Sequence, residues 1–328
     1  MRTTTPAPTL PRSRSEPTQS SQAVNRLQSE IRRRYYGIKT DLRTLFDSWL
    51  TGYYTEANSQ QSAILCNNEI GPASLYQVNA GEYSYALDGR MLAMLLERTQ
   101  AILDQWLLEG GPGDIWVGKF VATEYARGTQ SAYLSLAKQS VDYAEKTTLA
   151  ELLTSPAYQK RIGIAYAQSY SEWKGISDKA RADLASVLSD AVARGISPRE
   201  TAKIISKRLD VSMSGAFNIA QTEQVGAYRK AQWDETDDTQ SRLGMRTALL
   251  WLSALKDTTR AWHAARHGKT FTTEDVRAFY AEGGNRYHCY CSQIPILVDA
   301  NMQPVSQTLV VKLAAERKEW EEEYKKAA

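Results

Sequence analysis

All three histidines of this chain and two of its three cysteines fall between Trp251 and Pro295. A chain that gathers its rarest side chains in one stretch is expected to fold that stretch as a compact unit around them. His263 and His267 are four residues apart, so they share one face if the segment around them is helical. Gly268 follows directly and predicts the end of that helix, because glycine adopts the left-handed conformation without steric cost.

This stretch predicts a zinc site. Zinc in proteins prefers a tetrahedron of thiolate and imidazole ligands, and a structural site is closed by four of them. An alternative is that the cysteines are small core residues and the histidines hydrogen-bond locally. The four candidate ligands are His263, His267, Cys289 and Cys291, with His288 as a fifth candidate.

Several unusual residues occur here in a characteristic order: Trp251, Asp257, Arg260, His263, His267, Gly268, Phe271, Cys289, Cys291 and Pro295. In this order they resemble the signature of the phage head morphogenesis family, the minor capsid proteins similar to Mu protein F and to the minor head protein of phage SPP1. The resemblance extends over about residues 195–298.

The resemblance implies a phage minor head protein that is made in the host cytoplasm and ends inside the virion capsid at the portal vertex. Its expected partners are the portal protein and other head or scaffold proteins. It would act in head assembly and in DNA packaging or ejection through protein contacts, not as an enzyme. The resemblance also implies that Asp257 and Arg260 fix the geometry of the unit, although their spacing alone predicts a local ion pair. Trp251 and Phe271 are predicted core anchors.

Length and composition set the frame. At 328 residues the chain can form two domains, and its formal charge of +3 does not make it a nucleic-acid coat. An odd number of cysteines does not build a disulfide scaffold, so a reducing compartment is expected. Cys66, far in sequence from the others, is expected to be a small buried residue. No apolar run is long enough to cross a membrane.

The periodicity of apolar residues predicts a mainly α fold, with a long helical N-terminal part and a small α+β C-terminal unit. Thirteen of the eighteen tyrosines lie between Tyr35 and Tyr170. Such tyrosines pack in a core or form a protein interface, and their number favours the interface. The predicted organisation is a disordered basic arm over 1–22, a tyrosine-rich docking domain over 23–194, the head morphogenesis domain over 195–300 and a charged helical tail over 301–328.

Local signals divide this framework further. Ser197 before Pro198, with Glu200 three residues after the serine, predicts a helix start with a capping box. Separate helices are expected over 158–173, 177–194, 197–209 and 213–233, followed by an acidic turn over 234–241. Short apolar runs predict strands over 247–253 and 294–298, and helices are expected over 257–267 and 274–280.

Two other functions remain open. A metal-dependent nuclease or toxin-like enzyme would use the same His/Cys cluster, with Asp257 or Glu274 in an open metal site. A DNA-binding protein would need a basic stripe on a folded face. The arginine-rich arm over 1–22 is either a solvated tail or a segment that touches packaged DNA.

Overall fold

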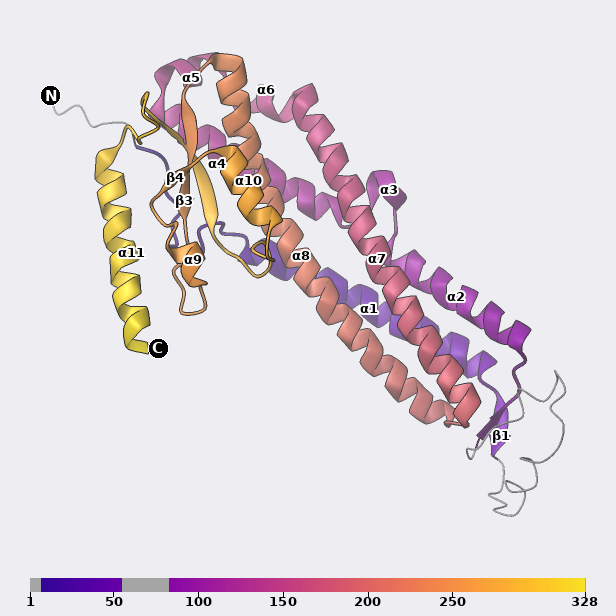
Figure 1. Cartoon of the computed structure of the whole chain (residues 1–328). Helices are drawn as coiled ribbons and strands as arrows, with labels where there is room; N and C mark the ends of the chain where they lie inside the picture. The colour runs from indigo at the N-terminus through magenta and orange to yellow at the C-terminus, as the bar shows by residue number, and fades with distance from the viewer. Residues whose placement is uncertain (1–6, 55–82, 328) are drawn as a thin grey trace. The chain divides into compact units, whose positions relative to one another are not determined.

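The computed structural model describes residues 7–54 and 83–327, and it is mainly helical, as predicted (Figure 1). The chain divides into two compact units. Unit 1 contains Met1–Leu27, Val117–Gln168 and Asn218–Ala328, and unit 2 contains Gln28–Trp116 and Ser169–Phe217. The predicted boundary at 194/195 therefore lies inside unit 2, at the turn between two helices that both continue into unit 1.

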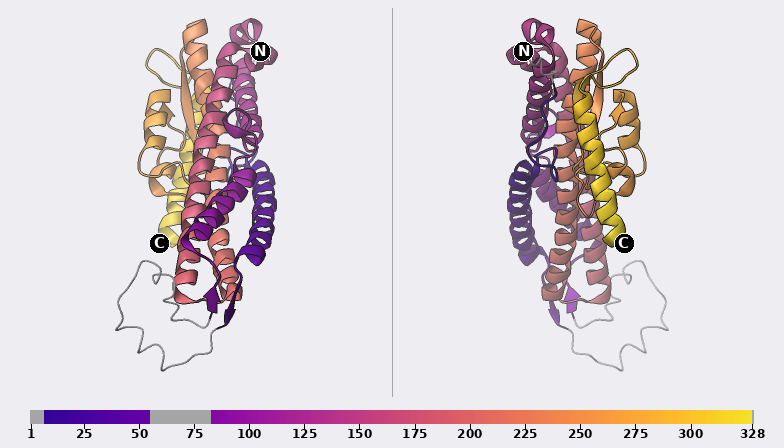
Figure 2. Two further views of the ribbon diagram at one scale, coloured as in Figure 1. Left: turned by 90° about the vertical axis from the view of Figure 1, so that its right-hand side faces the viewer. Right: turned by 90° about the vertical axis from the view of Figure 1, so that its left-hand side faces the viewer.

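Three long helices belong to both units (Figure 2): α1 (Ser21–Trp49), α7 (Pro156–Arg194) and α8 (Pro198–Leu243). The predicted start of α8 is confirmed, because the Glu200 N–H donates to Ser197 Oγ over 3.4 Å. Three predicted breaks are wrong. The helix α7 continues through Gly175, and α8 continues both through residues 210–212 and through the acidic segment 234–241.

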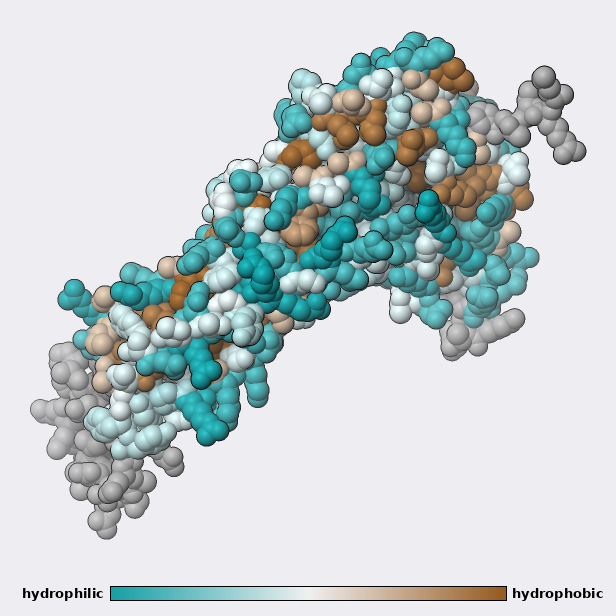
Figure 3. Space-filling view, turned by 180° about the vertical axis from the view of Figure 1, so that it is seen from behind, coloured by the Kyte–Doolittle hydropathy of each residue, from teal (hydrophilic) through white to brown (hydrophobic). Residues whose placement is uncertain are grey.

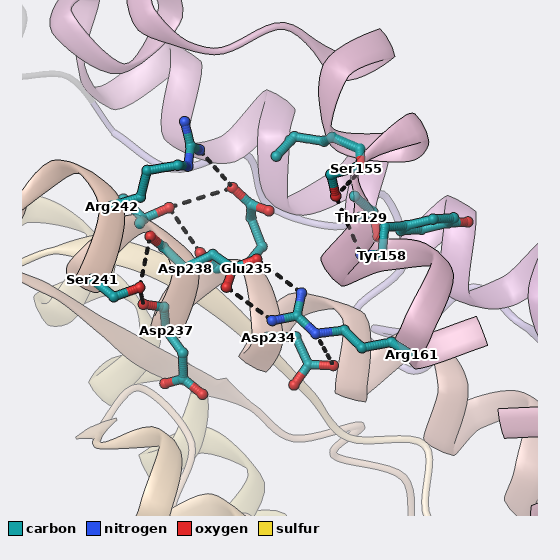
Figure 4. A network of polar contacts seen from close by, with 12 residues as sticks. Thr129, Ser155, Tyr158, Arg161, Asp234, Glu235, Asp237, Asp238, Ser241 and Arg242 are labelled. Carbon is teal, nitrogen blue, oxygen red and sulfur yellow. Dashed lines mark hydrogen bonds and ion pairs between the residues drawn. The ribbon is translucent and has the colours of Figure 1, made fainter. Parts of the chain in front are cut away.

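The acidic segment of α8 is helical because basic side chains on other elements of unit 1 neutralise it. Arg161 on α7 holds both carboxylate oxygens of Asp238 at 2.8 Å, as Figure 4 shows. Arg277 donates to Asp234 over 2.7 Å and to Asp237 over 2.9 Å. Two-pronged arginine–carboxylate pairs fix geometry as well as charge, so these carboxylates hold neighbouring elements of the unit on the helix.

Unit 1 is built on a three-stranded antiparallel sheet in the order β4-β3-β5. The strands are β3 (Thr247–Leu252), β4 (Thr270–Phe271) and β5 (Ser292–Leu297). The two predicted strands are confirmed as β3 and β5. The strand β4 was not predicted, because two residues are too few to carry a period.

Alternate residues of β3 face opposite sides of the sheet, and both sides are covered. Leu249 and Trp251 pack with aromatic residues of α8 and of α10 (Thr273–Ala281). Leu250 and its neighbours on the other face pack against Leu313 of α11 (Gln307–Ala327). The predicted charged tail is thus a helix docked on its own sheet.

The outer edge of β5 is closed by α4 (Gly118–Gln139). Gln139 donates from Nε2 to the Pro295 carbonyl over 3.1 Å and accepts at Oε1 from the Leu297 N–H over 3.0 Å. The Gln139 side chain therefore makes the two hydrogen bonds that a neighbouring strand would make with β5. This part of the sheet edge is thus protected from pairing with a strand of another chain. Two short helices of the same unit are α5 (Val141–Lys146) and α6 (Leu149–Thr154).

The described part of the N-terminal arm is not a free tail. Leu10 packs against the sheet cluster around Leu250, and Arg14 pairs with Glu319 at 3.1 Å. Thr18 and Ser20 are fully buried. The prediction of disorder over 1–22 is therefore wrong for residues 7–20, because a few apolar and hydroxyl side chains are enough to fix an extended segment on unit 1.

Unit 2 combines its parts of α1, α7 and α8 with a hairpin and two helices. The hairpin pairs β1 (Gly52–Tyr54) with β2 (Tyr83–Tyr85), and the helices are α2 (Gly89–Leu107) and α3 (Gly111–Asp114). At its centre the Arg34 guanidinium lies 4.0 Å from the ring centre of Trp116 and donates to Glu109 over 2.6 Å. Cys66 lies outside the described residues. None of the described helices is long and apolar enough to span a membrane.

The tyrosines of the helical half are divided between core and surface. Core positions are occupied by Tyr35, Tyr83, Tyr85, Tyr125 and Tyr143. Strongly exposed rings belong to Tyr36, Tyr53 and Tyr54, which are 75%, 64% and 66% accessible. The structure therefore confirms a core role for some of these tyrosines, and the three exposed rings lie in unit 2, where an interface stays a prediction.

Candidate metal centre

Residues 253–260 connect β3 to the helix that carries His263. The helix α9 is short, Ala261–Ala264, and begins later than the sequence predicts. Beyond it, the Arg266 N–H bonds to the His263 carbonyl and the His267 N–H to the Ala264 carbonyl, both from residue i to i−3. Such tight turns advance about 120° per residue instead of about 100°. Two histidines four residues apart therefore diverge.

His263 lies beside the Cys289-x-Cys291 segment that leads into β5. Its Nδ1 is 3.4 Å from Cys289 Sγ and 3.7 Å from Cys291 Sγ, and the three potential ligand atoms lie within 4.8 Å of one another. All three residues are buried. A tetrahedral zinc ion with bonds of about 2.0–2.1 Å to nitrogen and 2.3 Å to sulfur separates those two ligands by about 3.5 Å. The observed distances fit that edge.

The same Nδ1 faces two sulfur atoms. Because Arg260 Nη1 lies 3.5 Å from His263 Nε2, one arrangement that fits has the proton on Nδ1, from where it is donated to the sulfur atoms. A metal ion bound by all three atoms is the other arrangement that fits. Two thiolates and one imidazole are a donor set that zinc prefers.

Arg229 on α8 lies under this group and is 2% exposed. Its Nε donates to the Cys291 carbonyl over 2.7 Å and its Nη2 to the Cys289 carbonyl over 2.6 Å. The guanidinium also stacks 4.5 Å from the ring centre of Tyr280. Sequence reasoning missed Arg229. No signal in the sequence marked it, because its partners are backbone carbonyls.

The surroundings of the two cysteines shift their pKa values in opposite directions. Burial pushes the pKa of Cys289 upward, but the Cys291 thiol, the Arg229 guanidinium and His263 hold that pKa well below its usual value. The hydrogen bond to Cys289, together with burial, raises the pKa of Cys291 well above its usual value. Arg229 and His263 therefore favour the thiolate form of Cys289, and the thiolate is the form of cysteine that binds a metal.

His267 does not join this group. Ser253 donates its backbone N–H to His267 Nδ1 over 3.0 Å, and His267 Nε2 lies 3.4 Å from a carboxylate oxygen of Glu316 on α11. Burial lowers the pKa of His267 to about 4, although Glu316 acts in the opposite direction. The predicted four-ligand set is thus reduced to three residues that could hold a metal, with His267 as a separate, neutral histidine.

A cavity of about 150 Å³ opens beside the three ligand side chains, which form part of its wall. His288 is exposed and lines the cavity, with its backbone in the left-handed region at φ 51°. The other lining residues are Ala254, Lys256, Thr258, Thr259, Arg260 and Tyr290.

The region that contains these site residues and the helices before them is similar to a known protein family. Residues 182–294 match the family model of phage Mu protein F like proteins. The match confirms the resemblance drawn from the signature residues, and it covers about a third of the chain. No curated protein and no solved structure matches the chain.

Within the Mu F like region, the aromatic signature residues are core anchors, as predicted. Trp251 is fully buried, with its ring stacked 5.4 Å from that of Tyr280 and Phe271 at 5.8 Å. Gly268 has a φ of 75°, and a Cβ on it would lie 2.8 Å from Leu313 Cβ. The helix α9 ends at Ala264, earlier than the predicted end at Gly268, and Gly268 instead lets α11 approach the chain closely.

The polar signature residues of the Mu F like region act differently from the local ion pair that their spacing predicts. Arg260 donates to the carbonyl oxygens of Asn285 over 3.3 Å and Tyr287 over 2.9 Å. Asp257 is exposed in the turn before α9. Arg260 thus ties the loop that precedes Cys289 to the start of α9, which places His263 opposite the cysteines.

Proposed function

We propose that this protein is a phage minor head protein that works by contact with the portal protein and other head or scaffold proteins. The observation that carries the proposal is the match of residues 182–294 to phage Mu protein F like proteins. It would be made in the host cytoplasm and incorporated inside the capsid at the portal vertex. There it would serve head assembly and DNA packaging or ejection.

The docking surface that we propose is the set of exposed tyrosines of unit 2, Tyr36, Tyr53 and Tyr54. Tyrosine is common at interfaces because its ring is apolar and its hydroxyl remains hydrated. The face of the molecule drawn in Figure 3 mixes brown apolar residues with teal hydrophilic ones, as on other protein surfaces. Hydropathy therefore marks no docking surface on this face, and the proposed surface is defined by the three exposed tyrosine rings.

The test is a pull-down of the full chain with the purified portal protein. Interface hot spots that contain tyrosine typically lose about 2 kcal/mol or more on truncation. The double variant of Tyr53→Ala and Tyr54→Ala should therefore weaken portal binding by about thirtyfold or more. Tyr287→Ala removes an exposed ring from unit 1 and is the matched control. Equal binding by wild type and the double variant would contradict this surface, and no binding by any of them would contradict the portal contact.

We propose further that His263, Cys289 and Cys291 bind zinc. The ion would cross-link the α9 segment to the start of β5 and so stabilise the C-terminal part of unit 1. Purified protein should then hold about one equivalent of zinc, and a chelator should destabilise this part first. Cys289→Ser and His263→Ala should lose the metal, whereas His267→Asn should keep it. Retention of zinc by Cys289→Ser would contradict the ligand set.

A second candidate is a metal-dependent nuclease or related hydrolase. It is favoured by three protein ligands that line a cavity, since catalytic zinc sites keep one position for water or substrate. Against it, none of the described residues that line the cavity is Asp or Glu, so the wall offers no carboxylate as a general base. Metal-dependent DNA cleavage that His263→Ala abolishes in a folded protein would establish this candidate in place of the first.

A further inference from the structure

The cavity beside the metal centre is lined by positive and hydroxyl side chains. The Lys256 ammonium lies 3.9 Å from the ring centre of Tyr290, and Arg260 donates to backbone carbonyls. Because these partners are uncharged, none of these contacts neutralises either cation. Thr258 and Thr259 add hydroxyl groups, and His288 lies at the same wall. This lining attracts anions.

The buried positive charge of Arg229 also favours an anion at this cavity. A zinc ion bound by two thiolates and one neutral imidazole has no net charge. Arg229, which is buried under the cysteines, then remains as an uncompensated positive charge, and buried charges are costly unless they are paired. When the metal is bound, the buried positive charge of Arg229 therefore lies near the positive charges of Lys256 and Arg260 at the cavity wall. An anionic ligand in the cavity would balance these charges.

We propose that this cavity binds an oxyanion of the phosphate class, held between the metal centre and the side chains of Lys256 and Arg260. This inference rests on the zinc site proposed above. Inorganic phosphate and a terminal phosphate of DNA share the required chemistry, since each offers anionic oxygens to a metal, an ammonium and a guanidinium. The cavity volume of about 150 Å³ admits such a group and is below the usual range of about 300–1,000 Å³ for drug-sized ligands.

The test uses the full chain loaded with cobalt(II), whose visible spectrum reports thiolate ligation and the number and type of ligands. Thiolate bands from cobalt should appear first, and they establish the metal site independently of any anion. Inorganic phosphate should then change the bands that report coordination number, with saturation at one equivalent per site. Cobalt bands without any response to phosphate would overturn the anion site and leave the metal site in place. Absence of the cobalt bands would overturn both.

Lys256→Met and a matched control separate the cavity from general charge. Loss of one nearby charge should weaken phosphate binding at least about fivefold, while cobalt ligation is unchanged. Lys269→Met removes the same charge from an exposed position outside the cavity lining and should leave binding unchanged. If the two variants weaken phosphate binding equally, the effect comes from long-range electrostatics, and the proposed anion site is contradicted.

Two further arms identify the fourth position and the source of the phosphate. His288→Asn tolerates the left-handed backbone and should keep the cobalt spectrum. Loss of cobalt by this variant would make His288 the fourth ligand and overturn the open site. A short DNA strand with a 5′ phosphate should compete with inorganic phosphate if the source is DNA. If only the free anion binds, the source is inorganic phosphate.

Discussion

The Nη2 of Arg229 donates a hydrogen bond to the backbone carbonyl oxygen of Cys289 over 2.6 Å. This contact joins the middle of a long helix to the loop that supplies two of the three proposed metal ligands. Since the guanidinium is buried, the contact sets both the position of the loop and the charge beneath the thiols. Helix α8 therefore supports the loop of the proposed metal centre.

Arg229→Met should unfold unit 1 more easily and weaken metal binding together. The methionine leaves two buried carbonyl oxygens without donors, and each such group costs about 1–3 kcal/mol. The expected loss in the free energy of unfolding is about 3 kcal/mol, measured by denaturant titration with metal content determined in parallel. Arg246→Met, at an exposed position of the same unit, is the control and should change stability by less than about 0.5 kcal/mol. Similar stability of the two variants would contradict the supporting role of Arg229.

Gly268→Ala should destabilise the protein more than Gly244→Ala. Both glycines have left-handed backbones, with φ of 75° and 64°, so each alanine costs about 1 kcal/mol of backbone strain. Only at Gly268 does the new Cβ meet another element, at 2.8 Å from Leu313 Cβ; at Gly244 it meets no described heavy atom within 4 Å. The additional cost should be about 1–3 kcal/mol, measured by thermal or denaturant unfolding. Equal losses of stability in the two variants would show that α11 moves away from the new Cβ at no cost in free energy.

Glu235→Gln should remove a pH dependence of stability between about pH 4.5 and 6. Burial raises the pKa of Glu235 from 4.5 to about 6, in spite of the hydrogen bond from Tyr143. The folded state thus binds this proton more tightly than the unfolded state, and the stabilisation present below pH 4.5 is lost as the pH rises through 6. The loss is on the order of 2 kcal/mol. Glutamine keeps an oxygen for Tyr143, so the variant should be the more stable protein at pH 7.5. Parallel pH profiles of the two proteins would contradict this assignment.

Much of the fold could be predicted from the sequence because local signals decide it. The cap at Ser197 determined where α8 begins, and the apolar run from Thr247 determined β3. The ends of helices were predicted less well, since Gly175 and the acidic segment 234–241 look like breaks. Contacts remote in sequence override them, such as the pairing of Arg161 with Asp238.

The candidate site was predicted in part for the same reason. His263 and the two cysteines were found because their rarity and proximity are visible in the sequence. His267 was assigned to them on an assumed helical period, which fails where the chain tightens after Ala264. Arg229 was missed because its partners are backbone carbonyls, and carbonyls leave no pattern in a sequence.

His267→Asn should make the protein less sensitive to acid. Burial lowers the pKa of His267 from 6.5 to about 4, so the unfolded state takes up this proton first as the pH falls. The stabilisation from the neutral ring is complete above pH 6.5 and is lost as the pH falls toward 4, with an upper limit of about 3 kcal/mol. Asparagine does not titrate and still offers an oxygen to the Ser253 N–H, which donates to Nδ1 in the native protein. The melting temperature of the wild type should therefore fall more steeply between pH 6.5 and 4 than that of His267→Asn. His288→Asn, at an exposed ring, is the control and should follow the wild type. If His267→Asn follows the wild type as well, the acid sensitivity has another source.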